Sequence, residues 1–310
     1  MKIIEKLWQK LSVNVLLIKF RLRYLLLNAQ TRWYELLNPS YIEHIQKNDI
    51  EPIFIVGSGR SGNTLLARIL HESGDVCFAP ENFTLWETYR LYLKNINKSW
   101  NEKVDLVIDK LLSQKDSFRW EKVDISELKE VLYFSDEQTL GNIIDKWYVN
   151  YSKNIDYPTN RWGCKTPNLT PHIHNFIKIF PNMKLVYIVR KPSDVIASFL
   201  KADIENIDSI ITSIVHWKFF NDFMLSNTSD IDVIIDYDKL IINKQAKKIL
   251  YNLLKLQHKE FIAFQNEDMN YKHLKNINTK IEQKANNKDQ IIFNIYDDFY
   301  EKRFKKLSHI

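Results

Sequence analysis

A glycine-rich loop is the part of the sequence whose residue types most clearly suit chemistry. Residues 57–64 read Gly-Ser-Gly-Arg-Ser-Gly-Asn-Thr, follow the apolar run 53–56, and hold three of the chain's six glycines. Glycines allow the sharp turn that brings backbone N–H groups against an anion. The helix expected to begin at Asn63 adds the positive end of its dipole. The loop therefore predicts a phosphate site. The alternative, an ordinary strand-to-helix turn that uses glycine only for its geometry, is less favoured.

The spacing within this loop matches two nucleotide-binding patterns. Gly57 to Thr64 has the spacing of a Walker A motif, but Asn63 stands where that motif needs lysine, so an NTPase is not expected. The same glycines fit the dinucleotide pattern G-x-G-x-x-G, with Glu81 near the place of the acid that binds a ribose. Arg60 adds a cation inside the loop, which favours an exposed terminal phosphate.

A second segment has the residues of an anion site. Arg190 directly follows the apolar run 184–189. Pro192 opens a helical pattern, and Ser198 lies about two turns into it. A guanidinium and a hydroxyl near a helix start suit a second phosphate at the carboxyl end of a strand. The alternatives, an ion pair for Arg190 and a small packing residue at Ser198, stay open on these residues alone.

Together the two segments resemble a known enzyme family. The stretches VGSGRSGNTLLARIL and IVRKPSDVIASFL are similar to the cofactor-binding elements of PAPS-dependent sulfotransferases, above all those of the tyrosylprotein and bacterial glycan branch. The resemblance covers roughly residues 51–257. It implies PAPS (3′-phosphoadenosine 5′-phosphosulfate) as sulfuryl donor and PAP as product.

The resemblance also implies which residues bind the donor. The loop would bind the 5′-phosphosulfate, the second element the 3′-phosphate, and a tyrosine in a segment similar to the family's Y-E-x-L element would lie near the cofactor. The residues so assigned are Arg60, Ser61, Gly62, Asn63 and Thr64 in the loop, Arg190 and Ser198 in the second element, and Tyr237. Asn63 replaces the family's usual threonine, and a packing role remains the alternative for Tyr237.

Sulfuryl transfer needs a base for the acceptor hydroxyl and cations for the leaving phosphate and sulfuryl oxygens. The resemblance implies Glu81 as the base, Lys165 in a K-x-P element as the cation on the bridging oxygen, and Arg60 as a further cation. Since these cations can stabilise the leaving group, no metal is required. Glu87, which we expect to face solvent, and His172 are the alternative bases.

Apolar runs and helical patterns predict the elements that position these residues. Strands are expected at 52–56, 184–189 and 231–235, with weaker candidates at 75–79 and 161–164. Helices are expected at 63–71, 85–93, 140–151, 170–180 and 192–200. The helix at 170–180 should have Thr170 as its N-cap and Pro171 as its first residue. The alternation predicts an α/β fold, a P-loop-like three-layer sandwich with a central parallel sheet.

The positions of helix-breaking residues predict the layout of the chain. No glycine follows Gly163 and no proline follows Pro192, so the last 118 residues should be mostly helical. We expect a helical N-terminal extension at 1–50 and a sulfotransferase-like α/β domain at 51–310, with a helical C-terminal region at 258–310. The two cysteines, Cys77 and Cys164, exclude a disulfide scaffold and are expected to be buried thiols.

The net charge of the chain indicates which kinds of binding partner to expect. The 310-residue chain has a net charge of +6, which favours anionic partners. We expect the acceptor to be a hydroxyl of an acidic glycan and expect no nucleic-acid partner. Richness in Asn, Ile and Lys suggests a bacterial source. Two other functions stay open: an NAD(P)-dependent oxidoreductase that uses the glycine loop, and a non-catalytic anion- or glycan-binding module.

Residues 8–27 combine apolar residues at helical spacing with lysines and arginines. The cations interrupt the stretch too often for a transmembrane helix or a secretory signal. A helix packed on the domain is favoured, and a helix lying on a membrane surface is the alternative. We therefore expect a cytoplasmic protein. If the helix lies on a membrane surface, we expect that surface to be the inner face of the membrane.

Overall fold

The computed structural model describes residues 2–114, 116–157, 159–202, 207, 209–257, 287–304 and 307–308, and leaves out the side chains of residues 2–9, 244 and 287–292. The chain forms two compact units. Unit 1 comprises Met1–Tyr24, Val56–Ile69 and Val186–Ile310, and unit 2 comprises Leu25–Ile55 and Leu70–Leu185.

The strands form one five-stranded parallel sheet in the order β2-β3-β1-β4-β5. They are β1 (Ile53–Val56), β2 (Cys77–Phe78), β3 (Trp162–Lys165), β4 (Lys184–Val189) and β5 (Val233–Asp236), each within or beside a predicted strand. β1 and β5 are buried throughout and β4 at all but its first residue, as expected for strands covered on both faces. The predicted α/β fold with a central parallel sheet is confirmed.

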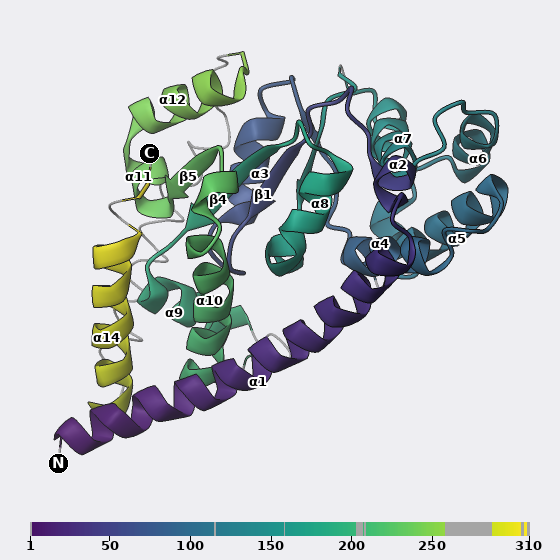
Figure 1. Cartoon of the computed structure of the whole chain (residues 1–310). Coiled ribbons are helices and arrows are strands. Elements are labelled where there is room, and N and C mark those ends of the chain that lie inside the picture. The colour runs from purple at the N-terminus through teal and green to yellow at the C-terminus, as the bar shows by residue number, and fades with distance from the viewer. Residues whose placement is uncertain are drawn as a thin grey trace. The chain divides into compact units, whose positions relative to one another are not determined.

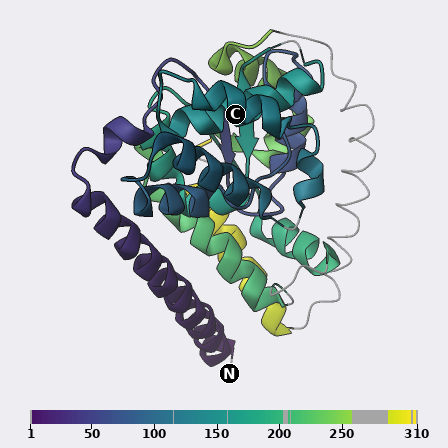
Figure 2. The ribbon, with the colours of Figure 1, turned by 90° about the vertical axis from the view of Figure 1, so that its right-hand side faces the viewer.

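Unit 1 holds the glycine loop, most of the helix that follows it, most of β4, all of β5, and helices from the second half of the chain. Its helices are α3 (Asn63–His71), α9 (Pro192–Ala202), α10 (Ile210–Leu225), α11 (Tyr237–Ile242), α12 (Lys244–Leu254) and α14 (Asn287–Arg303), with a short turn η3 (Thr228–Asp230). Figures 1 and 2 both show α14 alongside α10, where Trp217 packs edge-on against Phe299. The prediction of a mostly helical C-terminal half is confirmed for these elements, and its segment 258–286 lies outside the described residues.

Unit 2 has an aromatic core beside β3. Tyr148 stacks on Trp162 with ring centroids 4.3 Å apart, and Trp120 packs against Trp147 at 5.2 Å. The elements around this core are α2 (Tyr41–Ile45), α4 (Leu85–Lys94), α5 (Trp100–Leu112), η1 (Ser117–Trp120), α6 (Ile125–Tyr133), α7 (Leu140–Asn154), η2 (Pro167–His172) and α8 (Ile173–Ile179). These large rings supply much of the buried apolar surface of unit 2.

The predicted helix start at Thr170 is wrong. Thr170 and Pro171 lie inside the 3₁₀ turn η2, and α8 begins only at Ile173, with His172 as its N-cap. Pro167 and Pro171 lack backbone N–H groups and therefore cannot complete α-helical hydrogen bonds over this stretch. A tight 3₁₀ turn accommodates them, and the N-cap and first residue of the α-helix lie two residues later than predicted.

The N-terminal helix α1 (Lys2–Leu37) is longer than the predicted segment 8–27 and runs unbroken in Figure 2. In unit 1, Leu17 packs against Phe219 and Phe220 of α10, and Arg21 Nη2 lies 2.7 Å from Asp222 Oδ2. The favoured prediction, that this helix packs on the domain, is therefore confirmed for one of its faces.

Both cysteines are free and buried, as predicted. Burial raises the pKa of the Cys77 and Cys164 thiols to about 11, so both stay protonated near neutral pH. They act as small core side chains.

A buried histidine should make the fold sensitive to acid. His216 stacks on Phe220 at 4.4 Å, and burial lowers its pKa to about 4. Unfolded histidine takes up its proton near pH 6.5, so the unfolded state binds more protons between these values and stability falls as the pH drops. The free energy of unfolding of the wild type should therefore fall as the pH is lowered from about 7.5 to 5, and that of a His216→Phe variant should not fall for this reason. The variant should gain on the order of 2 kcal/mol relative to the wild type over this range.

Urea unfolding of both proteins at the two pH values measures this gain. If the difference in unfolding free energy between variant and wild type stays the same at both values, His216 does not titrate as inferred.

Candidate active site

The loop after β1 has the form of an anion cradle. Ser58 and Ser61 are buried and share a hydrogen bond of 2.6 Å between their hydroxyls. Arg60 is exposed and has a φ of 65°, a left-handed conformation that is uncommon outside glycine. The first turn of α3 follows, and its N–H groups have no acceptor within the helix. The loop thus places backbone donors and the Arg60 cation at one helix start.

Asn63 shapes this loop with its side chain. Its Nδ2 donates to the Ser58 carbonyl over 2.9 Å, and the side chain is buried. The amide therefore closes the loop from within, while the backbone N–H of Asn63 stays in the first turn of α3. Thr64, one residue later, is exposed.

Gly62 lies directly against Tyr237. Gly62 has a φ of 99°, and a Cβ added there would collide with the Tyr237 ring. Tyr237 is buried at the start of α11, and its ring centroid lies 4.3 Å from Cζ of Arg190. One tyrosine ring thus contacts both the loop and the second predicted anion element.

Arg190 is a buried guanidinium at the carboxyl end of β4. Its side chain is almost fully buried, and its Nε makes no hydrogen bond to the described residues. Asp194 Oδ2 lies 3.7 Å from that atom, which is ion-pair range, and Trp217 Nε1 donates to the Arg190 carbonyl over 3.1 Å. A buried cation with unused donor capacity is suited to a charged ligand oxygen.

The loop and the second element meet within unit 1. Arg60 Nε donates to Ser198 Oγ over 3.0 Å, from the loop after β1 to the middle of α9. The structure therefore brings together Arg60, Ser61, Gly62, Asn63, Thr64, Arg190, Ser198 and Tyr237 in one unit.

The structure adds a residue that sequence analysis gave no role. Asp297 of α14 accepts a 3.1 Å hydrogen bond from the Ser193 N–H at the start of α9, and its other oxygen lies 3.0 Å from Lys191 Nζ. Burial raises the pKa of this carboxyl. Because its partners are about a hundred residues away, no local pattern could have identified Asp297.

Glu81 and Lys165 form an ion pair in unit 2. Lys165 Nζ donates to Glu81 Oε1 over 2.7 Å, and both side chains are mostly buried. Lys165 is the last residue of β3 and pairs in register with Ile55 of β1, two residues before the glycine loop. Thr166 is extended, as expected for a residue before proline. The two predicted catalytic side chains are therefore direct neighbours.

The two alternative bases lie in other surroundings. Glu87 is exposed on α4, as predicted, and pairs with Lys110 of α5. His172 stacks on Trp86 with ring centroids 3.8 Å apart, and burial lowers its pKa to about 3. His172 is therefore neutral near pH 7, and its ring is part of the core.

No group of three or more His, Cys, Asp or Glu side chains in the described ranges is placed to hold a metal ion. Among the helices that the structure describes, none combines the length and apolar character needed to cross a bilayer.

The fold is that of an α/β protein with a central parallel sheet, and it brings the two predicted anion elements together. Residues 52–247 match the sequence profile of the sulfotransferase family. The chain therefore belongs to the sulfotransferase family. Comparison with curated protein sequences gives no match.

Solved structures of sulfotransferases are similar to the chain at low identity. The sulfotransferase domain from the curacin biosynthetic pathway is 19% identical, with 69% of this chain and 76% of that chain covered and a TM-score of 0.45. The sulfotransferase domain from the Synechococcus PCC 7002 olefin synthase is 17% identical, with 71% and 77% covered and a TM-score of 0.43. Sulfotransferase STF1 from Mycobacterium tuberculosis H37Rv is 13% identical, with 89% and 81% covered and a TM-score of 0.39.

Replacement of Gly62 tests the packing of the cradle. We expect Gly62→Ala to lower the free energy of unfolding by roughly 2–4 kcal/mol, because the new Cβ meets Tyr237 and the φ is positive. Gly59→Ala is the matched control, since its added Cβ lies 3.1 Å from Phe199 Cζ. Thermal or urea unfolding measures both, and equal losses in the two variants would contradict a special constraint at Gly62.

Proposed function

We propose that the protein transfers a sulfuryl group from PAPS to an acceptor hydroxyl. The observation that carries this proposal is the hydrogen bond from Arg60 to Ser198, which joins the two anion elements within unit 1. PAPS carries phosphate at two positions, and a donor with two anionic ends suits two adjoining anion elements. The family supports sulfuryl transfer over the dinucleotide alternative, which gives no role to Arg190 or Ser198.

The residues of unit 1 fit the two anionic ends of PAPS. The N–H groups of Ser61 to Thr64 and the Arg60 guanidinium would bind the 5′-phosphosulfate. Arg190, with its buried and unsatisfied Nε, and the Ser198 hydroxyl would bind the 3′-phosphate. Tyr237 would hold the Arg190 guanidinium in place through its ring.

Bound PAPS supplies the sulfuryl group and a phosphate as leaving group. Glu81, as a carboxylate, would accept the proton of the acceptor hydroxyl as that oxygen attacks sulfur. Lys165 would donate a hydrogen bond to the bridging oxygen and so stabilise the charge that develops on the leaving phosphate. Arg60 would neutralise charge on the same group.

The ion pair holds side by side the two residues to which we assign opposite roles, Glu81 as proton acceptor and Lys165 as hydrogen-bond donor. Both side chains must exchange this contact for one with the substrates. A bond of 2.7 Å between mostly buried groups fixes their starting positions.

We propose an acidic glycan as the acceptor. The net charge of +6 favours an anionic substrate. Phe83, two residues beyond Glu81, is 43% exposed and offers an apolar ring against which a sugar could pack. The aromatic residues of α4, α5 and α7 are mainly buried and are not available for such stacking.

Calorimetric titration with 3′,5′-ADP tests donor binding. We expect binding that weakens when the ligand lacks its 3′-phosphate, and a loss of roughly 30-fold or more in Arg190→Ala, because a buried charged hydrogen bond is removed. Arg119→Ala removes an equal charge at a residue paired with Asp116 and should bind normally. Preferential binding of NAD, or equal affinity in both variants, would overturn the proposal.

Steady-state kinetics with PAPS and an acceptor test the catalytic pair. Glu81→Gln should lower kcat by about 10²–10⁴-fold, and Lys165→Ala by about 10²–10³-fold, with 3′,5′-ADP binding retained. Glu87→Gln and Lys110→Ala are matched controls, because these residues form another lysine–glutamate ion pair between helices. Full activity in both Glu81→Gln and Lys165→Ala would contradict the catalytic roles assigned to these residues. Normal 3′,5′-ADP binding by the same variants would still support the proposal that the protein binds PAPS.

A further inference from the structure

Helix α1 has two apolar faces, and among the residues that the structure describes only one of them is packed against other elements. Val13 and Leu17 are buried, and Leu17 packs with Phe219 and Phe220 of α10. A second series of apolar residues is between 49% and 59% exposed, and it consists of Leu11, Val15, Ile18, Leu22 and Leu25. The exposed series continues toward the end of the helix with Trp33 and Leu36.

Helical geometry places the exposed series opposite the buried one. Its members are spaced alternately four and three residues apart, which keeps them in one line along the helix. Leu11 and Val13 differ by two residues, which is a rotation of about 200°. The exposed line is therefore a continuous apolar stripe on the side of α1 away from α10.

Charge identifies the kind of surface that this stripe fits. Between Lys10 and Tyr34 the helix carries five cations and no acidic residue. At about 100° per residue, Lys10, Arg21 and Arg32 lie along one border of the stripe, and Lys19 and Arg23 lie along the other. An apolar stripe between two rows of cations is the pattern of a helix that lies at a negatively charged bilayer surface.

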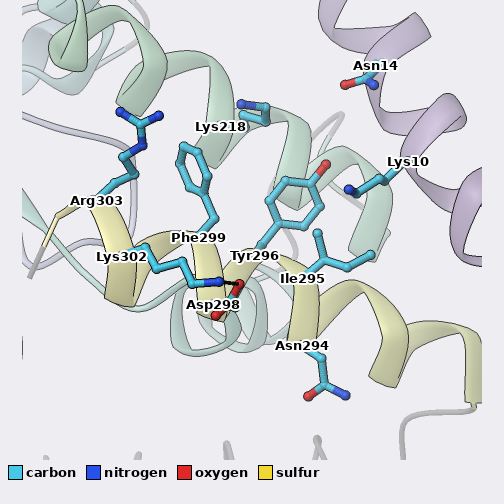
Figure 3. Close-up of a pocket in the computed structure, with 10 residues that line it drawn as sticks. All are labelled: Lys10, Asn14, Lys218, Asn294, Ile295, Tyr296, Asp298, Phe299, Lys302 and Arg303. Carbon is cyan, nitrogen blue, oxygen red and sulfur yellow. Dashed lines mark hydrogen bonds and ion pairs between the residues drawn. The ribbon is translucent and has the colours of Figure 1, made fainter.

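A basic pocket adjoins one of these borders. It has a volume of about 700 Å³ and is lined by Lys10 and Asn14 of α1, Lys218 of α10, and residues of α14 that include Lys302 and Arg303 (Figure 3). Asp298 is the acid in this lining and pairs with Lys302. The pocket therefore adds positive charge beside Lys10.

We propose that α1 binds in the plane of an anionic phospholipid bilayer, with its exposed stripe among the upper parts of the acyl chains. The leucines, valine and isoleucine of the stripe lose their contact with water, and the border cations other than Arg21, which pairs with Asp222, contact lipid phosphates. The helix lies on the bilayer without crossing it, in agreement with its hydropathy.

A second copy of the chain fits the stripe less well. Two α1 helices paired through it would bring rows of lysine and arginine together, without an acidic residue from Lys10 to Tyr34 to compensate them. Like charges along a helix pair destabilise it, whereas helix pairs are stabilised by opposite charges at these positions. The anionic bilayer satisfies both the apolar stripe and its cationic borders.

Flotation of the full-length protein with vesicles tests the proposal. Vesicles of phosphatidylcholine with about one third phosphatidylserine should bind the protein, and vesicles of phosphatidylcholine alone should bind it at least tenfold more weakly. Leu22→Glu combined with Leu25→Glu should abolish binding. Val131→Glu combined with Phe134→Glu is the matched control, because it changes two exposed apolar residues of α6 and its C-cap and should bind as the wild type does.

A charge variant and a solution measurement complete the test. Lys19→Glu combined with Arg23→Glu should weaken binding to the anionic vesicles by about 25-fold or more. Circular dichroism and thermal unfolding check that each variant is folded. The proposal is overturned if folded wild-type protein stays with the aqueous phase, or if sedimentation without lipid shows a dimer that the Leu22→Glu, Leu25→Glu variant lacks.

Discussion

The close approach of the Tyr237 ring to Gly62 is the constraint on which the proposed anion site of unit 1 depends. The ring occupies space that any side chain at position 62 would need, and it also contacts the Arg190 guanidinium. A buried guanidinium is costly unless its charge is compensated, and the ring and Asp194 supply part of that compensation. One aromatic side chain thus fixes the loop after β1 relative to the cation at the end of β4.

The ion pair between Glu81 and Lys165 applies a similar principle in unit 2. Two mostly buried side chains of opposite charge lie in direct contact, so each supplies the partner that the other needs away from water. In the proposed reaction these two groups would accept a proton and stabilise the charge of the leaving phosphate. The same pairing makes either residue dependent on the other, since removal of one leaves a partly buried charge behind.

The parts of the fold that follow from local patterns could be predicted from the sequence. β1, β4 and α3 come from short apolar runs and from glycines that allow one particular turn, and their ends agree closely with prediction. The hydrogen bond from Arg60 to Ser198 and the contact of Tyr237 with Arg190 depend on residues far apart in the chain, and the sequence did not predict these contacts. The family resemblance indicated only that the four residues lie near one cofactor. No local pattern in the sequence indicated that Glu81 and Lys165, which are 84 positions apart, would form an ion pair. The predicted start of α8 was wrong because the segment with Pro167 and Pro171 forms a 3₁₀ turn before the α-helix begins.

The contact of Asp297 with α9 has a consequence for how the protein is made. The carboxylate that receives the Ser193 N–H lies 104 residues later in the chain. At a synthesis rate of about 5–20 residues per second, β4 and α9 wait on the order of 5–20 s on the ribosome before that carboxylate exists. Throughout this interval Lys191 and the start of α9 lack the anion that neutralises them in the finished protein. The order of translation therefore makes the second anion element one of the last parts of unit 1 to reach its final charge balance.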